Sequence, residues 1–188
     1  RDRNLVIESL QKSINSSAKG YAASFDKPTS GASIRASVNQ LKMNLDNIRT
    51  TQDDPQSTKN FCKGTLTVTV PSKLIQNADI TREYNGEYDV KEDAYQQDLE
   101  LDANTVNYEI EYSVQPTDDG EVIFVESQNG NDLSTFLAYV VVDADQKNNV
   151  KGKKVVEAKQ EAKRVSACLL YTSDAADDGP SVDLGGRR

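Results

Sequence analysis

Histidine and tryptophan are absent from the 188-residue sequence, and cysteine, methionine and proline are scarce. Without an imidazole, the chain can form neither a Ser-His-Asp triad nor a Cys-His pair, and it offers no histidine ligand for zinc. The glycines form no glycine-rich phosphate-binding loop. These absences exclude the common hydrolase, nucleotide and histidine–zinc sites, and we expect no catalytic residue, no metal site and no cofactor.

Long hydrophobic runs and a surplus of positive charge are also lacking. No run reaches the roughly 18 apolar residues that a membrane-spanning helix needs, and no signal-peptide pattern is present. The 30 acidic residues outnumber the 22 basic ones, which gives a net charge of −8. Nucleic-acid binding requires a clustered positive face. We therefore expect no nucleic-acid partner and no membrane span within these residues, so that any anchor would lie upstream of Arg1.

The sequence that is present begins with an amphipathic helix, predicted over residues 4–24 and followed by a turn at 26–31. Its polar face carries Glu8, Gln11 and Lys12. Apolar residues recur on the other face at the helical period, which predicts that this face packs against another element. These apolar positions are Leu5, Leu10, Ile14, Ala18, Tyr21 and Phe25.

Beyond the turn the period becomes two, which is typical of strands. Apolar residues alternate over 34–38 and then in the opposite phase over 41–45, so we predict one strand with a β-bulge at Asn39 and Gln40. A loop is expected over 50–60. The next strand, 61–70, places Cys62 on the same face as its core residues, and Pro71 ends it.

The clearest strand is 106–114, which alternates strictly between apolar and polar residues. A tight loop at 116–120 and a second strand at 121–126 complete a β-hairpin. The structure of residues 72–103 is left open. Its start, with Leu74, Ile75, Ala78 and Ile80, is compatible with a short helix.

Residues 132–146 fit either a helix or, around Val140–Val142, a strand, and we favour the helix. Residues 147–167 are charged and are expected to form a solvated or frayed helix. We therefore predict the α+β class, with the N-terminal helix packed on a mostly antiparallel, curved sheet of about four strands. One domain over 1–146 is expected, followed by the charged segment 147–167.

The acidic stretch between residues 79 and 121 offers a candidate interaction surface. Its carboxylates could hold Ca²⁺ or a basic partner, but it lacks a calcium-binding loop, so a solvated face is the favoured interpretation. Tyrosine rings in the same stretch could form a recognition surface or could cover the sheet. The candidate residues are Tyr84, Tyr88, Tyr95, Asp89, Glu92 and Asp93.

The C-terminal residues carry a resemblance of an unusual kind. The run Cys168–Asp178 resembles one reading frame through the Nextera transposase adapter, and Val182–Arg188 is similar to the flow-cell primer that follows it. This implies that 168–188 is a non-native, adapter-derived tail and that native polypeptide stops near Ala167. Leu169, Leu170 and Tyr171 should then form no part of the core.

A second resemblance covers roughly residues 4–145. The string Phe61–Pro71, the strand Tyr108–Gln115 and the hairpin ending at Glu126 resemble small uncharacterised envelope domains of Gram-negative bacteria, and the element order looks like the cystatin-like or nuclear-transport-factor-2-like folds. The resemblance implies a periplasmic or outer-envelope location, a membrane or lipid anchor upstream, and another envelope protein as partner. A cytoplasmic location is the alternative.

Cys62 allows two interpretations. A thiol needs a base or a positive neighbour to become nucleophilic, and Lys63 points to the opposite face of the strand, so we favour a small buried residue. The envelope resemblance alternatively implies pairing with a cysteine that is missing from this sequence.

We expect a non-catalytic extracytoplasmic domain with a protein-interaction or structural role. The alternative is a small-ligand-binding or enzymatic member of the same cone-shaped folds, which would use a cavity between helix and sheet with Tyr108 and Tyr112 as polar contacts. A filled helix–sheet interface favours the first function and an open polar pocket the second. An immunity or inhibitor protein ranks third, and the oligomeric state is left open.

Overall fold

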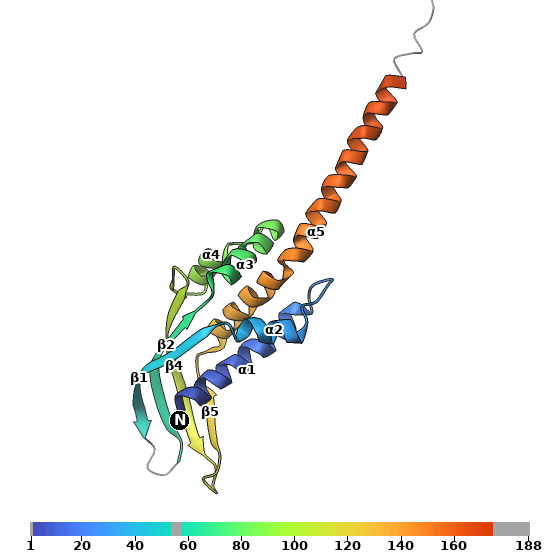
Figure 1. Cartoon of the computed structure of the whole chain (residues 1–188). Coiled ribbons are helices and arrows are strands. Elements are labelled where there is room, and N and C mark those ends of the chain that lie inside the picture. The colour runs from blue at the N-terminus through green and yellow to red at the C-terminus, as the bar shows by residue number, and fades with distance from the viewer. Residues whose placement is uncertain (1, 54–57, 175–188) are drawn as a thin grey trace, which may run out of the picture. The chain divides into compact units, whose positions relative to one another are not determined.

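The computed structural model describes residues 2–53 and 58–174, with side chains described over 3–52 and 58–161. Within them the chain is an α+β protein in which the N-terminal helix packs on an antiparallel sheet, which confirms the predicted class (Figure 1). The helices are α1 (Asp2–Ala22), α2 (Gly31–Val38), α3 (Ser72–Asn85), α4 (Val90–Gln96) and α5 (Asn131–Asp174). The strands are β1 (Lys42–Asp53), β2 (Asn60–Thr69), β3 (Leu101–Asp102), β4 (Thr105–Pro116) and β5 (Ile123–Ser127).

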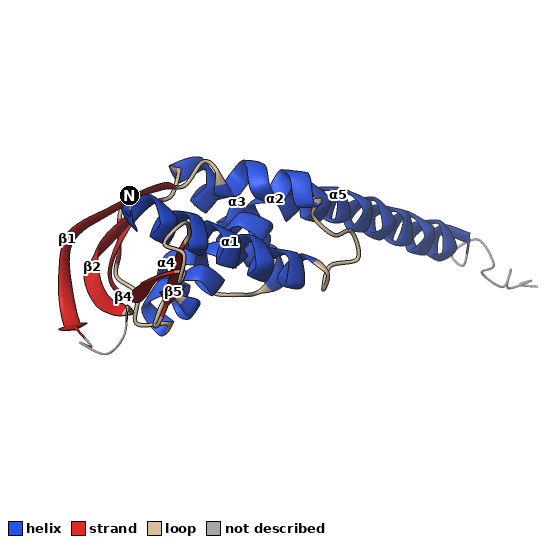
Figure 2. Ribbon diagram, turned by 90° about the horizontal axis from the view of Figure 1, so that it is seen from below, coloured by secondary structure: helices blue, strands red, loops and turns tan. Residues whose placement is uncertain are grey.

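The sheet is antiparallel throughout, in the order β1-β2-β4-β3, and β5 also pairs with β4. Figure 2 shows its strands bending around the helices on one face. Between β3 and β5, the side chain of Asn129 completes the edge of β4, accepting from the Glu111 amide at 2.8 Å and donating to the Glu109 carbonyl at 3.0 Å. One side chain thus satisfies backbone groups that another strand would otherwise pair.

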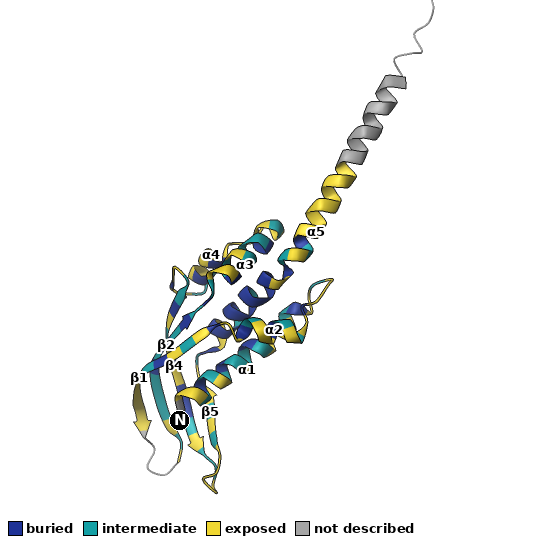
Figure 3. Ribbon diagram, viewed as in Figure 1, coloured by how far each residue is buried: buried dark blue, intermediate teal, exposed yellow. Residues whose placement is uncertain are grey.

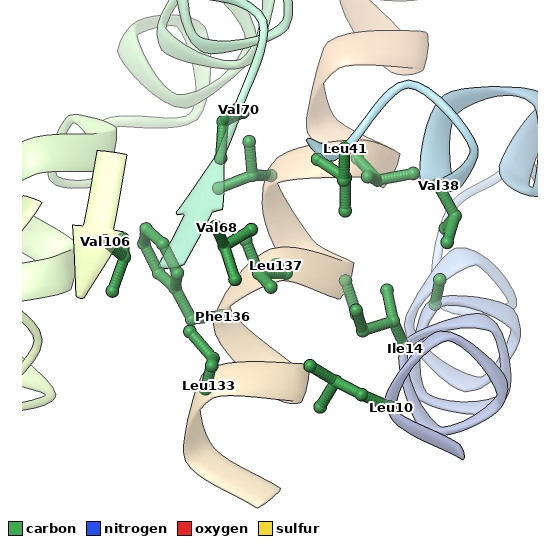
Figure 4. Close-up of a cluster of buried hydrophobic side chains, with 14 of the residues drawn as sticks. Leu10, Ile14, Val38, Leu41, Val68, Val70, Val106, Leu133, Phe136 and Leu137 are labelled. Carbon is green, nitrogen blue, oxygen red and sulfur yellow. The ribbon is translucent and has the colours of Figure 1, made fainter. Parts of the chain in front are cut away.

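The main core lies between the sheet and the first half of α5. Figure 4 shows Phe136 and Leu137 of α5 next to Val68 and Val106 on the strands, with Ile14 of α1 on the other side. All five side chains are fully buried. Burying one side chain of this kind contributes about 1.5–3 kcal/mol, so this layer supplies much of the stability of the fold.

The helix predicted at 132–146 is confirmed as the first part of α5, and its surroundings explain why a strand was also compatible. Val140, Val141, Val142 and Ala144 are all buried although they occupy different sides of the helix. Figure 3 shows this part of α5 enclosed by the sheet and the other helices. A helix covered on all sides is hydrophobic all round and loses its amphipathic period.

The prediction of a strand at 34–38 was wrong, because these residues form α2. The side chain of Ser30 caps the helix by accepting from the Ser33 amide at 3.1 Å. Ile34 and Val38, four residues apart, are buried, whereas Ala36 is exposed. The apparent change of phase at Asn39 and Gln40 is therefore the end of a helix and not a bulge.

Register shifts in this strand pair occur instead between Asp46 and Arg49 and between Thr50 and Gln52. Asn47, within the first, has a φ of 51°. Opposite it, Gly64 lies so close to β1 that a Cβ atom would approach the Asp46 carbonyl oxygen to 2.9 Å. The bulged strand therefore requires a glycine at position 64.

Other boundaries also differ from the prediction. In α1, Val6 is buried and Leu5 is only half-buried, so the core stripe repeats every four residues from Val6. The loop expected at 50–60 is shorter at its start, since β1 continues to Asp53. The hairpin of β4 and β5 is confirmed, and the open segment 72–103 contains α3, α4 and β3.

The chain divides into two compact units, Arg1–Asn148 and Asn149–Arg188. The expected boundaries at 146 and 167 stay predictions, as does the non-native origin of 168–188. The side chains of Leu169, Leu170 and Tyr171 lie outside the described residues, as do residues 175–188 altogether. All features of the candidate site belong to the first unit.

Candidate functional site

The segment between α3 and α4 places two tyrosines on the surface. Gly86 ends α3 in the left-handed conformation, with a φ of 74°, and the Glu87 amide then donates to the Arg82 carbonyl at 2.9 Å. Asp89 caps α4 by accepting from the Glu92 amide at 2.8 Å. This fixed turn exposes Tyr88, which precedes α4, and α4 itself carries the exposed Tyr95.

One hollow, which we call the α4 groove, collects three of the six predicted surface residues. It measures about 510 Å³ and includes the exposed Tyr95, Asp89 and Glu92. The buried Leu99 and Leu101 also line it. The complete lining is Asp89, Lys91, Glu92, Tyr95, Leu99, Glu100 and Leu101.

The other three predicted residues are placed differently. Tyr88 and Asp93 line a second hollow, and Asp93 turns inward to an arginine. Tyr84 is half-buried and lines neither hollow. The six residues therefore surround α4 without forming one continuous site.

A buried ionic network joins four helices beneath the second hollow. Arg82 of α3 is only 3% exposed, and its Nε donates to Oδ2 of Asp143 of α5 at 2.8 Å. Its Nη1 donates to Oδ2 of Asp93 of α4 at 2.9 Å. The hydroxyl of Tyr21 of α1 donates to the other oxygen of Asp143 at 3.0 Å. Because Asp143 is 1% exposed, its charge requires these partners.

The electrostatics of the network follow from burial and pairing. Burial raises the pKa of the Asp143 carboxyl, while the hydrogen bond and the charge of Arg82 oppose that rise. Burial also raises the pKa of the Tyr21 hydroxyl well above its ordinary value, and the charge of Asp143 adds to this effect. Burial alone would lower the pKa of Arg82. The hydrogen bond to Asp143 and the negative charge of Asp143 outweigh this effect, so the pKa of Arg82 is raised. The arginine is therefore a permanent cation.

The second hollow, which we call the tyrosine cleft, opens above this network. It measures about 650 Å³, within the range of small-ligand sites. Three tyrosine rings from three parts of the fold line it beside the charged groups. The lining residues are Tyr21, Arg82, Gly86, Glu87, Tyr88, Asp93, Tyr139 and Asp143.

Neither family models, nor curated proteins, nor solved structures match this chain.

Two further findings concern the described residues. None of their helices combines the length and the apolar character that crossing a bilayer requires. They also contain no group of three or more cysteine, aspartate or glutamate side chains arranged to hold a metal ion.

Sequence reasoning missed Arg82, Asp143, Tyr21 and Tyr139 as site residues. A signal for the central pair was present, because Asp143 interrupts the apolar run of Val140–Ala144. A carboxylate within a buried helix requires a cation, and Arg82 is one of few basic residues in the acidic stretch. The tyrosines gave no comparable signal, since their meeting depends on how the helices pack.

Where α5 packs on the sheet, the interface is filled with side chains. Tyr112 is buried, and the Tyr108 hydroxyl donates to the Asn129 carbonyl. A smaller hollow of about 390 Å³ lies near the end of β1, the start of β2 and the end of β4. Its lining includes Arg3, the half-buried Cys62 and Tyr112. Of the two tyrosines of the ligand-binding alternative, Tyr108 is engaged in this backbone hydrogen bond, and Tyr112 is buried but also contributes to the lining of this hollow.

Proposed function

We propose that this domain is a non-catalytic interaction domain that binds a basic segment of another protein on the face formed by α3 and α4. The observation that carries the proposal is the exposure of Tyr88 and Tyr95, at 65% and 74%, beside exposed carboxylates. Tyrosine is enriched in protein interfaces because its ring buries a large area and its hydroxyl can form a hydrogen bond.

The charge of this face defines the partner. Glu87, Asp89, Glu92 and Glu100 are exposed around the two rings, with Lys91 as the cation of the α4 groove. Complementary charge accelerates association and selects the partner. A segment rich in lysine and arginine matches the charge of the α4 groove.

The filled interface between α5 and the sheet supports an interaction role over a ligand cavity. Phe136, Leu137 and Val68 are fully buried between α5 and the sheet. The extracytoplasmic location, with another envelope protein as partner, is part of the proposal and is supported by the sequence resemblance alone. Fractionation of cells that express the gene tests it, and recovery in the cytoplasm would contradict the location.

The binding function can be tested with random peptides displayed on phage, selected on the purified domain. We expect enrichment of lysine- and arginine-containing peptides whose affinity falls as salt is raised. The double variant Tyr88→Ala/Tyr95→Ala should bind the selected peptides about thirtyfold more weakly, since loss of interface hot spots costs about 2 kcal/mol or more.

The matched control is Phe124→Ala on β5. Phe124 is an aromatic residue with an exposure of 64%, similar to that of Tyr88, but it lies at the opposite end of the domain (Figure 1). This variant should bind the peptides as the parent does. Selection of peptides without basic residues, or equal loss of binding in the control, would contradict the function.

A further inference from the structure

The tyrosine cleft brings aromatic rings and charged groups together. The rings of Tyr21 and Tyr139 lie against each other, with centroids 4.2 Å apart and planes inclined by 37°. Tyr88 also lines the cleft but is mostly exposed. The cleft therefore combines two fixed rings with a third that solvent still reaches.

The charge of the cleft is negative although an arginine lies in its floor. Arg82 is held by two carboxylates, Asp93 and Asp143, at 2.9 and 2.8 Å. Its positive charge is thus already engaged by the protein. Glu87 is exposed in the same lining and adds a third carboxylate. A cation entering the cleft meets more negative than positive charge.

Rings and carboxylates together select one class of ligand. The face of an aromatic ring carries negative electrostatic potential and attracts alkylammonium and guanidinium groups, which is how aromatic cages recognise them. An anion would be repelled by the carboxylates, and a neutral group would gain neither attraction. At about 650 Å³ the cleft has room for the head of a lysine or arginine side chain.

We propose that the tyrosine cleft is a binding site for one organic cation, the ammonium or guanidinium head of a basic side chain in the partner segment, held between Tyr88, Tyr139 and the carboxylate of Glu87. This inference rests on the proposed function, since it names the residue class that the α3–α4 face recognises. Tyr21 and Asp143 act as positioning residues, because their hydrogen bond at 3.0 Å fixes the floor.

The test uses small probes and NMR of the tyrosine rings in the full chain. Tetramethylammonium and N-acetyl-arginine amide are titrated in turn, with tert-butyl alcohol as an uncharged probe of similar shape to the first. We expect the resonances of Tyr21, Tyr88 and Tyr139 to shift with both cations and not with the alcohol. Equal shifts with the alcohol, or no shift with either cation, would overturn the proposal.

Variants assign the binding to this cleft. Tyr88→Ala should weaken tetramethylammonium binding about fivefold or more, whereas Tyr88→Phe, which keeps the ring, should retain it. Glu87→Gln should weaken binding of both cations. Because Tyr88 and Glu87 are exposed, these variants should fold as the parent does. Unchanged binding in Tyr88→Ala would place the cation elsewhere and refute the assignment.

Tyr95→Ala separates this inference from the proposed function. Tyr95 lines the α4 groove and not the tyrosine cleft, so its loss should weaken binding of the selected peptides and leave tetramethylammonium binding unchanged. If the peptides bind through Tyr95 but no cation enters the cleft, the cleft assignment fails and the interaction function stands. If the cation binds and no peptide does, the interaction function fails and the cleft stands.

Discussion

Two parts of the domain, the sheet on one hand and the helices α3 and α4 on the other, contact α5 in different ways. Towards the sheet, Phe136 and Leu137 are held by apolar contacts alone (Figure 4). Towards α3 and α4, Asp143 is held by a guanidinium and a phenol in directed hydrogen bonds. The hydrophobic effect is non-directional and favours close packing. The hydrogen bonds of an ionic network instead fix the orientation of their groups, and here the tyrosine cleft opens beside that network. The fold therefore gains stability where the sheet packs on α5, which we call the apolar side of the domain, and a shaped cleft where α3 and α4 meet α5, which we call the polar side.

Removing a large side chain from the apolar side should have the largest effect. Phe136→Ala should lower the free energy of unfolding by about 3–5 kcal/mol, because it removes buried area and leaves a cavity. Urea denaturation of the variant and the parent measures this difference. The exposed Phe124→Ala should change stability by less than about 0.5 kcal/mol. Similar losses in both variants would contradict the placement of the core.

On the polar side, Asp143→Ala should cost about 3 kcal/mol. This lies at the low end for breaking a buried ion pair, because Arg82 keeps Asp93 as a partner at 2.9 Å. Urea denaturation again measures the loss, and thermal melting followed by circular dichroism gives an independent reading.

The double variant Arg82→Met/Asp143→Leu sharpens the comparison. Replacing a buried ion pair by apolar residues of similar volume is often neutral or stabilising, so we expect stability within about 1 kcal/mol of the parent. The shape of the cleft should nevertheless change, and tetramethylammonium binding should fall. If the double variant were as unstable as Asp143→Ala, the network would stabilise the fold through more than the ion pair between Arg82 and Asp143.

The polar side should also respond to alkali. Tyr21 ionises near its ordinary pKa of 10.0 in the unfolded chain, whereas its pKa in the fold is higher. A raised pKa stabilises the fold below pH 10 and loses this contribution as the pH rises towards the folded pKa. Stability should therefore fall between pH 10 and 12 by at most about 1.4 kcal/mol per pH unit for this group.

Urea denaturation at a series of pH values measures this dependence, and Tyr21→Phe is the matched variant. It keeps the ring beside Tyr139 but removes the titrating hydroxyl, so its stability should fall less steeply above pH 10. Identical slopes for the variant and the parent would mean that Tyr21 titrates normally in the fold.

The same comparison explains which parts of the structure could be predicted. The helix α1, the hairpin and the α+β class depend on local periods that a sequence displays directly. The polar side depends on contacts between residues far apart, such as Arg82 and Asp143, which are 61 positions apart. No local pattern contains that pairing, and only the isolated charge of Asp143 in an apolar run indicated it.

The error at 34–38 has a local cause. In a stretch of five residues, apolar positions at 34, 36 and 38 satisfy a period of two, while those at 34 and 38 alone satisfy one helical turn. The cap at Ser30 and the burial of Ile34 and Val38 decide for the helix. The candidate interaction residues were partly predictable, because tyrosines among carboxylates are visible in sequence. Their exposure and their division between two hollows depend on the fold, including the turn at Gly86.

The substitution with the smallest expected effect on stability is one that should weaken cation binding strongly. Tyr88→Ala should change the free energy of unfolding by less than about 0.5 kcal/mol, since the side chain is 65% exposed, while binding of the cationic probes should fall. Urea denaturation and the NMR titration on the same preparation measure both quantities. Asp143→Ala should show the reverse, with a loss of free energy of unfolding that is larger than its effect on binding of the cationic probes. A destabilised Tyr88→Ala would mean that its ring supports the helices, and the distinction between the packed side of the domain and the side proposed for binding would not hold.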